Sequence, residues 1–213
     1  MYRARRLLDL LVWYQSELVE LGKERSHEML EIRFRPDSDE PPIVSAAAEY
    51  KRLWEAEGEK IVRQFATTTG LTFAVHAMDA RVFEGTSQSD PLSLRASYDK
   101  ETKLGTLIHE LAHHLVQGHT ARSAGSLDRP DRQRENHELI DLFLFDVWAD
   151  LYGQTFARRQ VDVESRRRPM YREVWAATLT LDRVGRAARL QVLLRTRGVE
   201  PSREHRRERT GSP

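Results

Sequence analysis

The segment that most constrains the fold of this chain is 106–115, TLIHELAHHL, because it places His-Glu-x-x-His within an apolar helical pattern. In a helix, His109 and His113 project from one face about one turn apart, so both imidazoles can reach one metal ion. The other positions of the segment are mostly apolar, which predicts a buried helix. Because buried histidine and glutamate side chains need polar partners, other elements must enclose this helix and supply them.

Glu110 stands between the two histidines and is offset around the helix, so its carboxylate can reach a water molecule on the open side of the ion. Zinc lowers the pKa of such a water toward neutrality, and the carboxylate can take its proton. The pattern therefore predicts a Zn²⁺ site with His109 and His113 as ligands and Glu110 as the catalytic base. The competing interpretation is a coincidental pattern on a surface helix. We expect His114, about 100° further around the helix, to be a packing or surface residue.

Catalytic zinc usually has three protein ligands, so a third residue is expected. Asp146 is the preferred candidate, because it lies in a very apolar helical stretch where a carboxylate needs a cation or a donor. Asp150, one turn on, is expected to accept a proton from a ligating histidine and to fix its tautomer. The alternatives for the third ligand are Glu138, His137 and His119. The competing interpretation is that the two aspartates act as caps or pair with arginines.

The periodicity along the chain predicts a mixed α+β architecture. Expected helices cover 2–22, 45–68, 100–117, 135–160 and 169–197, and expected strands cover 31–35, 71–77, 81–84 and 92–97. Residues 118–134 are polar and are expected to form a loop. This organisation predicts a helical region over 1–70, a catalytic core over 71–160, a second helical region over 161–200 and a disordered tail over 201–213.

Composition excludes several classes of protein. The chain has 213 residues, enough for a compact domain with a core, and its charged fraction of 31% fits a soluble, helix-rich protein. No apolar run reaches the roughly 20 residues that span a bilayer, so no membrane partner is expected. The absence of cysteine excludes thiolate ligands and fits a cytoplasmic location. The net charge is only +1, and the arginine runs at 166–168 and 203–209 are expected to be solvated rather than bound to nucleic acid.

The motif segment resembles a known group of enzymes. Residues 104–113, LGTLIHELAH, followed by Gly118 and His119, are similar to the ImmA/IrrE-type zincins, and 146–150, DVWAD, resembles their later Glu-x-x-Ala-Asp segment with aspartate in place of glutamate. The resemblance covers about 92–153 and implies a zincin-like fold, a small sheet packed on the motif helix with flanking helices. It also implies Asp146 as the third ligand. The SprT-like proteases resemble the HELAHHL stretch as well, and their third histidine from a downstream loop or helix start points to His137.

Together these features predict a zinc metallopeptidase that hydrolyses peptide bonds of an intracellular protein. The strand before the motif helix is expected to bind the substrate backbone by edge addition, through Leu92, Ser93, Leu94, Arg95 and Ala96. The residue that stabilises the oxyanion stays open, with the candidates Tyr98, His119, His137 and Tyr152. The alternative is a non-catalytic zincin scaffold that binds a protein or nucleic acid through the arginine-rich regions, although a site kept only for binding would not need Glu110.

Overall fold

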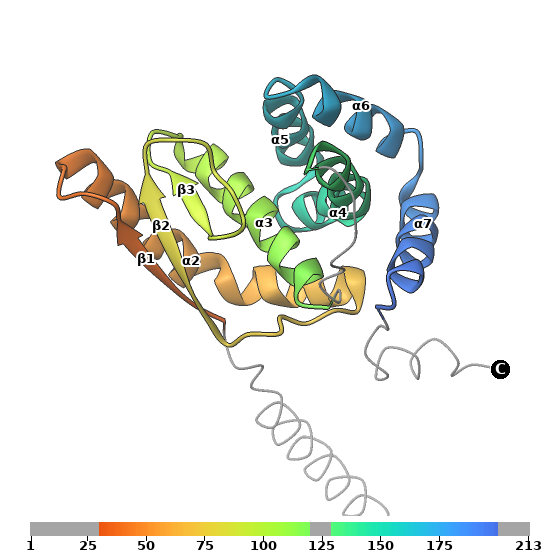
Figure 1. Ribbon diagram of the computed structural model, residues 1–213, viewed down its shortest axis with the longest axis horizontal. Helices are drawn as coiled ribbons and strands as arrows, with labels where there is room; N and C mark the ends of the chain where they lie inside the picture. The colour runs from red at the N-terminus through yellow and green to blue at the C-terminus, as the bar shows by residue number, and fades with distance from the viewer. Residues whose placement is uncertain (1–29, 120–128, 200–213) are drawn as a thin grey trace, which may run out of the picture.

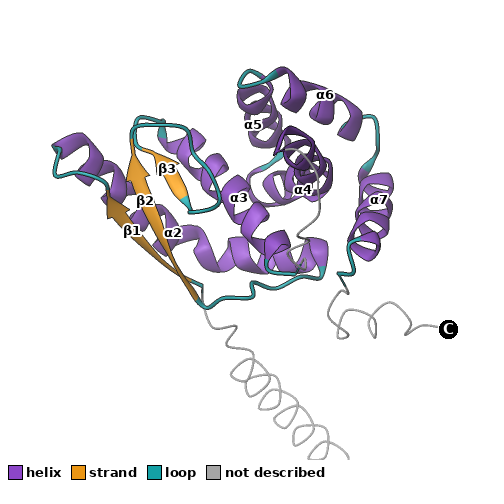
Figure 2. Cartoon of the chain, in the orientation of Figure 1, coloured by secondary structure: helices purple, strands orange, loops and turns teal. Residues whose placement is uncertain are grey.

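The computed structural model describes residues 30–119 and 129–199. They form a mixed α/β structure that is mostly helical, with a small three-stranded parallel sheet. The strands lie together at one side of the molecule and helices α4 to α7 at the other, with α2 and α3 running between them (Figure 1, Figure 2). The element bounds are β1 Glu31–Pro36, α2 Pro41–Thr69, β2 Ala77–Phe83, β3 Ser93–Arg95, α3 Lys100–Gln117, α4 Arg129–Tyr152, α5 Gln154–Ser165, α6 Pro169–Thr178 and α7 Arg183–Thr196.

The first part of the fold is a β1–α2–β2 unit in which α2 packs against the sheet. Two prolines occupy the first turn of α2, where their missing N–H groups would have no helical partner. The helix ends at Gly70, whose φ of 73° is accessible to glycine and whose N–H bonds the carbonyl of Ala66 at 2.8 Å. The predicted strand at 31–35, the predicted helix at 45–68 and its stop at Gly70 are confirmed.

The predicted strand at 71–77 is wrong, because residues 71–76 are irregular and β2 begins only at Ala77. The alternation that suggested a strand has a different cause. Leu71 is buried and Phe73 packs edge-on against Phe65, with ring centroids 5.9 Å apart, whereas Thr72 and residues 74–76 are exposed. Two apolar residues spaced two apart give the same period as a strand, but the ladder between β1 and β2 begins only at Ala77, and the segment before it offers β1 one bond, from the N–H of Glu31 to the carbonyl of His76 at 2.9 Å. The short strand predicted at 92–97 is confirmed as β3.

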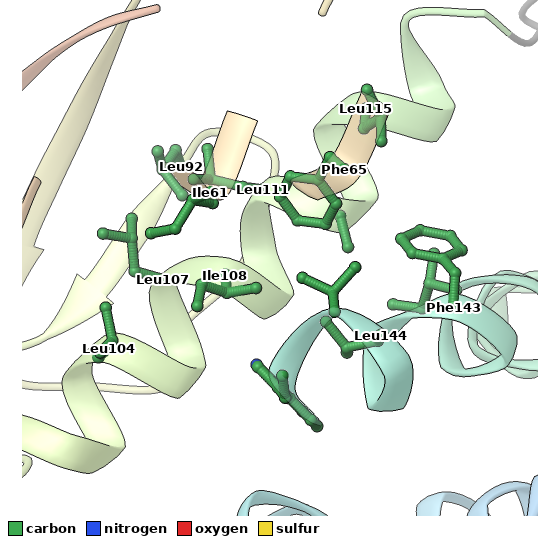
Figure 3. Close-up of a cluster of buried hydrophobic side chains, with 14 of the residues drawn as sticks. Ile61, Phe65, Leu92, Leu104, Leu107, Ile108, Leu111, Leu115, Phe143 and Leu144 are labelled. Atoms are coloured by element: carbon green, nitrogen blue, oxygen red, sulfur yellow. The ribbon is translucent and has the colours of Figure 1, made fainter. Parts of the chain in front are cut away.

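Helix α3 has the bounds predicted for the motif helix, Lys100–Gln117. Asp99 caps it, since its carboxylate accepts a hydrogen bond from the N–H of Thr102 at 2.8 Å. Buried side chains occupy 13 of its 18 positions, so the helix is enclosed on nearly every side. Figure 3 shows its apolar face packed against α2 and α4, through Leu104, Leu107, Ile108, Leu111, Leu115, Ile61, Phe65, Phe143 and Leu144.

The helices after α3 are shorter than predicted. The single helix expected over 135–160 begins earlier, at Arg129, and breaks at Gly153, whose φ of 88° lies where side-chain-bearing residues are strained. The single helix expected over 169–197 is divided into α6 and α7, and the Asp182 carboxylate caps α7 by accepting from the N–H of Gly185 at 2.7 Å. Helix α4 contacts α2, α3, α5, α6 and α7 and so joins the motif helix to the rest of the helical part.

Three of the predicted segments lie wholly or partly outside the described residues. They are the helix at 2–22, part of the loop at 118–134 and the tail at 201–213. Within 30–119 and 129–199, no helix combines the length and the apolar character that crossing a membrane requires.

Candidate metal centre

Three histidines from two helices converge at the centre of the helical part. His109 and His113 come from α3 and His137 from α4, and each offers one ring nitrogen to a group whose members lie within 4.8 Å of one another. The three ring centroids are 5.0–5.1 Å apart. The Nε2 atoms of His109 and His113 are 3.2 Å apart, and two nitrogens bound tetrahedrally to zinc at about 2.0–2.1 Å would be about 3.3 Å apart. The group could therefore hold a metal ion.

The protonation of two of these histidines also suits a metal. Burial lowers the pKa of His113 well below its ordinary value, and it lowers the pKa of His137 to about 3, with the charge of His109 acting in the same direction. Both rings are thus neutral near neutral pH, which is the form of imidazole that binds metals. At His109 burial acts in the same way, but the carboxylate of Glu164 raises the pKa of His109 instead. Three imidazoles suit zinc, copper, iron and nickel, so the donor set fits a divalent transition metal without identifying it.

A buried glutamate from a third helix orients His109. Glu164 of α5 places one carboxylate oxygen 2.5 Å from Nδ1 of His109, and its other oxygen accepts a hydrogen bond from the indole N–H of Trp175 at 2.9 Å. Burial by itself would raise the pKa of Glu164, but His109 outweighs it and the pKa is lowered. A carboxylate on the second nitrogen of a ligating imidazole fixes the ring and its tautomer, and it makes the ligand more basic.

The close approach of α3 and α5 brings this glutamate to its histidine. Gly105 lies one turn before His109, and a Cβ at this position would overlap the side-chain amide of Gln160. Gln160 lies one turn before Glu164 on α5. Because Gly105 has no side chain, α3 and α5 can approach each other closely at this point. The point lies one helical turn from the contact between Glu164 and His109.

Glu164→Gln is expected to weaken zinc binding by about 10- to 100-fold while the chain stays folded, because an amide supports the ligating ring less strongly than a carboxylate. The measurement is a competition titration against a zinc chelator of known affinity. The matched control is Asp162→Asn on the exposed side of the same helix, which should leave the affinity unchanged. Equal affinities in the wild type and Glu164→Gln would show that Glu164 does not support a ligand.

Asp141 lies beside His137 much as Glu164 lies beside His109. It lies one turn further along α4, is fully buried, and has one oxygen 3.5 Å from Nδ1 of His137. Neither oxygen of Asp141 has a hydrogen-bond partner among the described residues. Burial raises the pKa of Asp141 well above its ordinary value, and the charge of Glu164 acts in the same direction. Two of the three histidines thus have a buried carboxylate on their outer side.

Glu110 is buried beside this group, with 4% of its surface exposed. Burial raises the pKa of its carboxyl to about 7, although His109 and Arg167 partly oppose the shift. A carboxylate with a pKa near neutrality is well suited to exchange protons with a substrate or a water molecule. The site is not sealed, because His113, Arg167 and Tyr171 around it are only half-buried.

The structure does not place Asp146 with the histidines, so the preferred candidate for the third ligand is wrong, and His137, one of the alternatives, completes the group that could hold a metal ion. Both carboxylate oxygens of Asp146 accept hydrogen bonds from Arg186 of α7, at 2.6 and 3.0 Å, and the two side chains are 7% and 8% exposed. His137 and Asp146 are nine residues apart on α4, so they project about 180° from each other. One side of α4 therefore faces α3 and the other faces α7. The alternative in which the aspartate pairs with an arginine is the one that the structure contains.

The remaining candidates for the metal site also lie elsewhere. The carboxylate of Asp150 binds Arg183 through both oxygens, at 2.6 and 2.8 Å, and not a histidine. Nε2 of His119 lies 2.6 Å from a backbone carbonyl oxygen of the segment before β2. Glu138 is exposed and is not a member of the metal-ligand group. His114 is half-buried and also outside this group, as expected for a packing residue.

The outer edge of β3, predicted to bind substrate, is occupied by the chain itself. The N–H and C=O of Ser93 both bond Gln88, at 2.8 and 3.0 Å. The N–H of Arg95 donates to the hydroxyl of Ser87 at 3.0 Å, and its C=O accepts from the hydroxyl of Tyr50 at 2.9 Å. Because these outward-facing backbone groups already have partners, β3 offers no free edge to a peptide in this conformation.

Tyr152 lies away from the histidine group, whereas Tyr171 packs against it. The hydroxyl of Tyr152, one of the candidates for oxyanion stabilisation, donates to Glu57 at 2.8 Å and so belongs to the contact between α2 and α4. Tyr171 of α6 was not predicted, yet its ring lies 4.3 Å from that of His137 and its hydroxyl accepts a hydrogen bond from Gln133 at 2.8 Å. Tyr171 is thus the tyrosine that packs directly on the histidine group.

Glu164 was also missed, although the sequence contains a signal for it. Gln160 and Glu164 share the buried face of α5 with three apolar residues, Phe156, Ala157 and Val161, in a helical spacing. Polar side chains on the apolar face of an amphipathic helix need buried partners. Asp146 was selected because a carboxylate on an apolar helix face needs a partner, and the same reasoning applies to Glu164.

Comparisons with protein-family models, with curated proteins and with solved structures find no match to this chain. The resemblance of the motif segment to zincins therefore stays a prediction. The assignment of the site depends on the geometry of the described residues.

Proposed function

We propose that this protein is a zinc-dependent metallopeptidase with a zincin-like arrangement around α3. One observation carries the proposal: His109, His113 and His137 converge while the Glu110 carboxylate stands beside them on the same helix. Three protein ligands with a neighbouring carboxylate are what a hydrolytic zinc site requires, because a fourth position stays available. A site serving only the stability of the fold would need no carboxylate with a pKa near neutrality in this position.

The residues of the chain have separate tasks in this proposal. His109, His113 and His137 would hold the zinc ion, which when bound polarises a peptide carbonyl and lowers the pKa of water. Glu110 accepts the proton of the attacking water and then delivers it to the leaving amine. Glu164 holds the ring of His109 in place, and Asp141 lies on the outer side of His137.

The three-histidine arrangement favours one of the two resemblances. The resemblance to ImmA/IrrE-type zincins implies a carboxylate ligand at Asp146, which is paired with Arg186 instead. The resemblance to SprT-like proteases implies a histidine near the start of the next helix, the position of His137 in α4. We therefore place the proposed activity nearer to the SprT-like pattern, with an unfolded or extended protein segment as the substrate.

The proposal predicts that purified protein contains about one zinc per chain and cleaves unfolded protein substrates. Removing the metal with a chelator should abolish cleavage, and adding back one equivalent of zinc should restore it, because the three histidines already converge in the folded chain. The matched control is His119→Ala, which removes a histidine close to the motif but outside the ligand group and should keep both zinc and activity. Stoichiometric zinc without cleavage of a broad set of unfolded proteins and peptides would contradict the proposal.

A further inference from the structure

Arg167 is a cation beside the proposed machinery, and its charge lowers the pKa of Glu110. It follows α5 and is half-buried, whereas its neighbours Arg166 and Arg168 are exposed. Its Nη2 donates to the hydroxyl of Thr106 at 3.2 Å. Since Thr106 is one helical turn before Glu110, this bond places the guanidinium on the Glu110 side of α3.

The guanidinium has a second contact, with an aromatic ring. Its central carbon lies 5.4 Å from the centroid of the Tyr98 ring, a cation–π contact that holds the group over the aromatic face. Thr106 and Tyr98 come from the motif helix and from the turn before it, so Arg167 joins the segment after α5 to the motif helix. Two independent contacts therefore set the position of the Arg167 guanidinium.

Most of the hydrogen-bonding capacity of Arg167 is unused. A guanidinium has five N–H donors in a planar fork that matches a carboxylate. Among residues 30–119 and 129–199, Arg167 makes the bond to Thr106 and no ion pair, whereas Arg183 and Arg186 each hold an aspartate through two bonds. Its charge nevertheless reaches the site, because it acts on the pKa of both Glu110 and His137.

We infer that Arg167 binds a carboxylate of the peptide substrate, so that the site prefers peptides with an acidic group close to the bond that is cut. The inference rests on the proposed function and adds the class of substrate to it. The carboxylate can belong to an acidic side chain or to the C-terminus of the peptide. Both present the same planar pair of oxygens, and both fit the free side of the guanidinium.

The test measures binding rather than turnover. Zinc-loaded Glu110→Gln protein is titrated with three fluorescent peptides of one length: a neutral amidated peptide, the same peptide with one central aspartate, and the neutral peptide with a free C-terminal carboxylate. At least one carboxylate peptide should bind about 10- to 100-fold more tightly than the neutral peptide, as expected for a charge-assisted contact. The carboxylate that gives the gain identifies its source, an internal acidic residue or the chain end.

Substitutions then assign the preference to Arg167. Arg167→Gln on the same background should abolish the difference between the peptides, Arg167→Lys should retain part of it, and the exposed neighbour variant Arg166→Gln should retain all of it. If Arg167→Gln does not fold, a peptide with lysine in place of the central aspartate is tested on the parent protein and should bind more weakly than the neutral peptide. Equal affinity for all peptides, or a preference that survives Arg167→Gln, would overturn the inference.

The outcome is separable from that of the proposed function. Protein that binds acidic peptides through Arg167 but cleaves none of them would refute the peptidase proposal and leave the carboxylate site standing. Wild-type protein that cleaves neutral and acidic peptides with equal kcat/KM, while binding them equally, would refute the carboxylate site and leave the peptidase proposal standing.

Discussion

Glu110→Gln is expected to lower kcat/KM for peptide hydrolysis by about 10²–10⁴-fold and to leave the zinc content unchanged. Glutamine has nearly the same shape as glutamate but cannot accept the proton of the attacking water. Glu110 is not one of the three residues that converge on the metal position, so the ligands keep their geometry. The measurement is steady-state cleavage of a quenched fluorescent peptide, with zinc per chain determined on the same samples.

The control is Glu138→Gln, which removes an exposed carboxylate one residue after His137 and should retain wild-type activity. The folding of each variant is compared by thermal unfolding. A Glu110→Gln protein that keeps its zinc and cleaves within a few-fold of the wild-type rate would show that Glu110 is not the base. The proposed mechanism would then be wrong even if the metal site is right.

Asp146→Ala is expected to lower the free energy of unfolding by about 3–5 kcal/mol, because it leaves the guanidinium of Arg186 buried without its partner. The ion pair is almost inaccessible to water, and its second arginine contact, to the carbonyl of Leu181, satisfies only one of the remaining donors. The loss is measured by denaturant unfolding with zinc in excess. Folded Asp146→Ala protein should still bind one zinc per chain.

Asp150→Ala is the matched control for this effect. Asp150 lies one turn further along α4 and also pairs with an arginine of α7, but the side chain of Arg183 is 60% exposed. Solvent screens such a pair, so its removal is expected to cost only about 0–1 kcal/mol. Folded Asp146→Ala protein that loses its zinc, or equal stability losses in the two variants, would contradict the assignment of Asp146 to an ion pair.

The motif helix and its two histidines could be predicted because the residues that determine them lie within one short stretch of sequence. The four-residue spacing of His109 and His113 fixes their common face, and the capping residue Asp99 and the apolar positions between 104 and 115 fix the extent of the helix. Glu110 follows from the same spacing. A single helix thus contains both the geometry and the chemistry that the prediction used.

The third member of the histidine group could not be predicted in the same way, because its place in the group depends on how α3 and α4 meet. The pattern around Asp146 correctly indicated that a buried carboxylate needs a partner, and Arg186 is that partner. A helical pattern shows that both sides of α4 are buried, but it does not show which side meets α3. His137 and Asp146 point in opposite directions, so the choice between them required the tertiary structure.

The helix boundaries after α4 show a related limit. The apolar pattern continues across Gly153, so a single long helix fitted the sequence, yet the chain adopts a positive φ there and begins α5 in a new direction. That change of direction brings Glu164 back to His109. The position of α5 against α3 involves residues far apart in the sequence, such as Gly105 and Gln160, so a local pattern does not reveal the break.

The central claim is that three imidazoles bind one zinc ion. X-ray absorption spectroscopy of zinc-loaded wild-type protein tests it most directly, because the outer-shell scattering counts the imidazole rings on the metal. The structure predicts three rings in the wild type and two in His137→Ala, with Asp146→Asn unchanged at three. A wild-type spectrum with only two imidazoles, or one in which His137→Ala has no effect, would contradict the account.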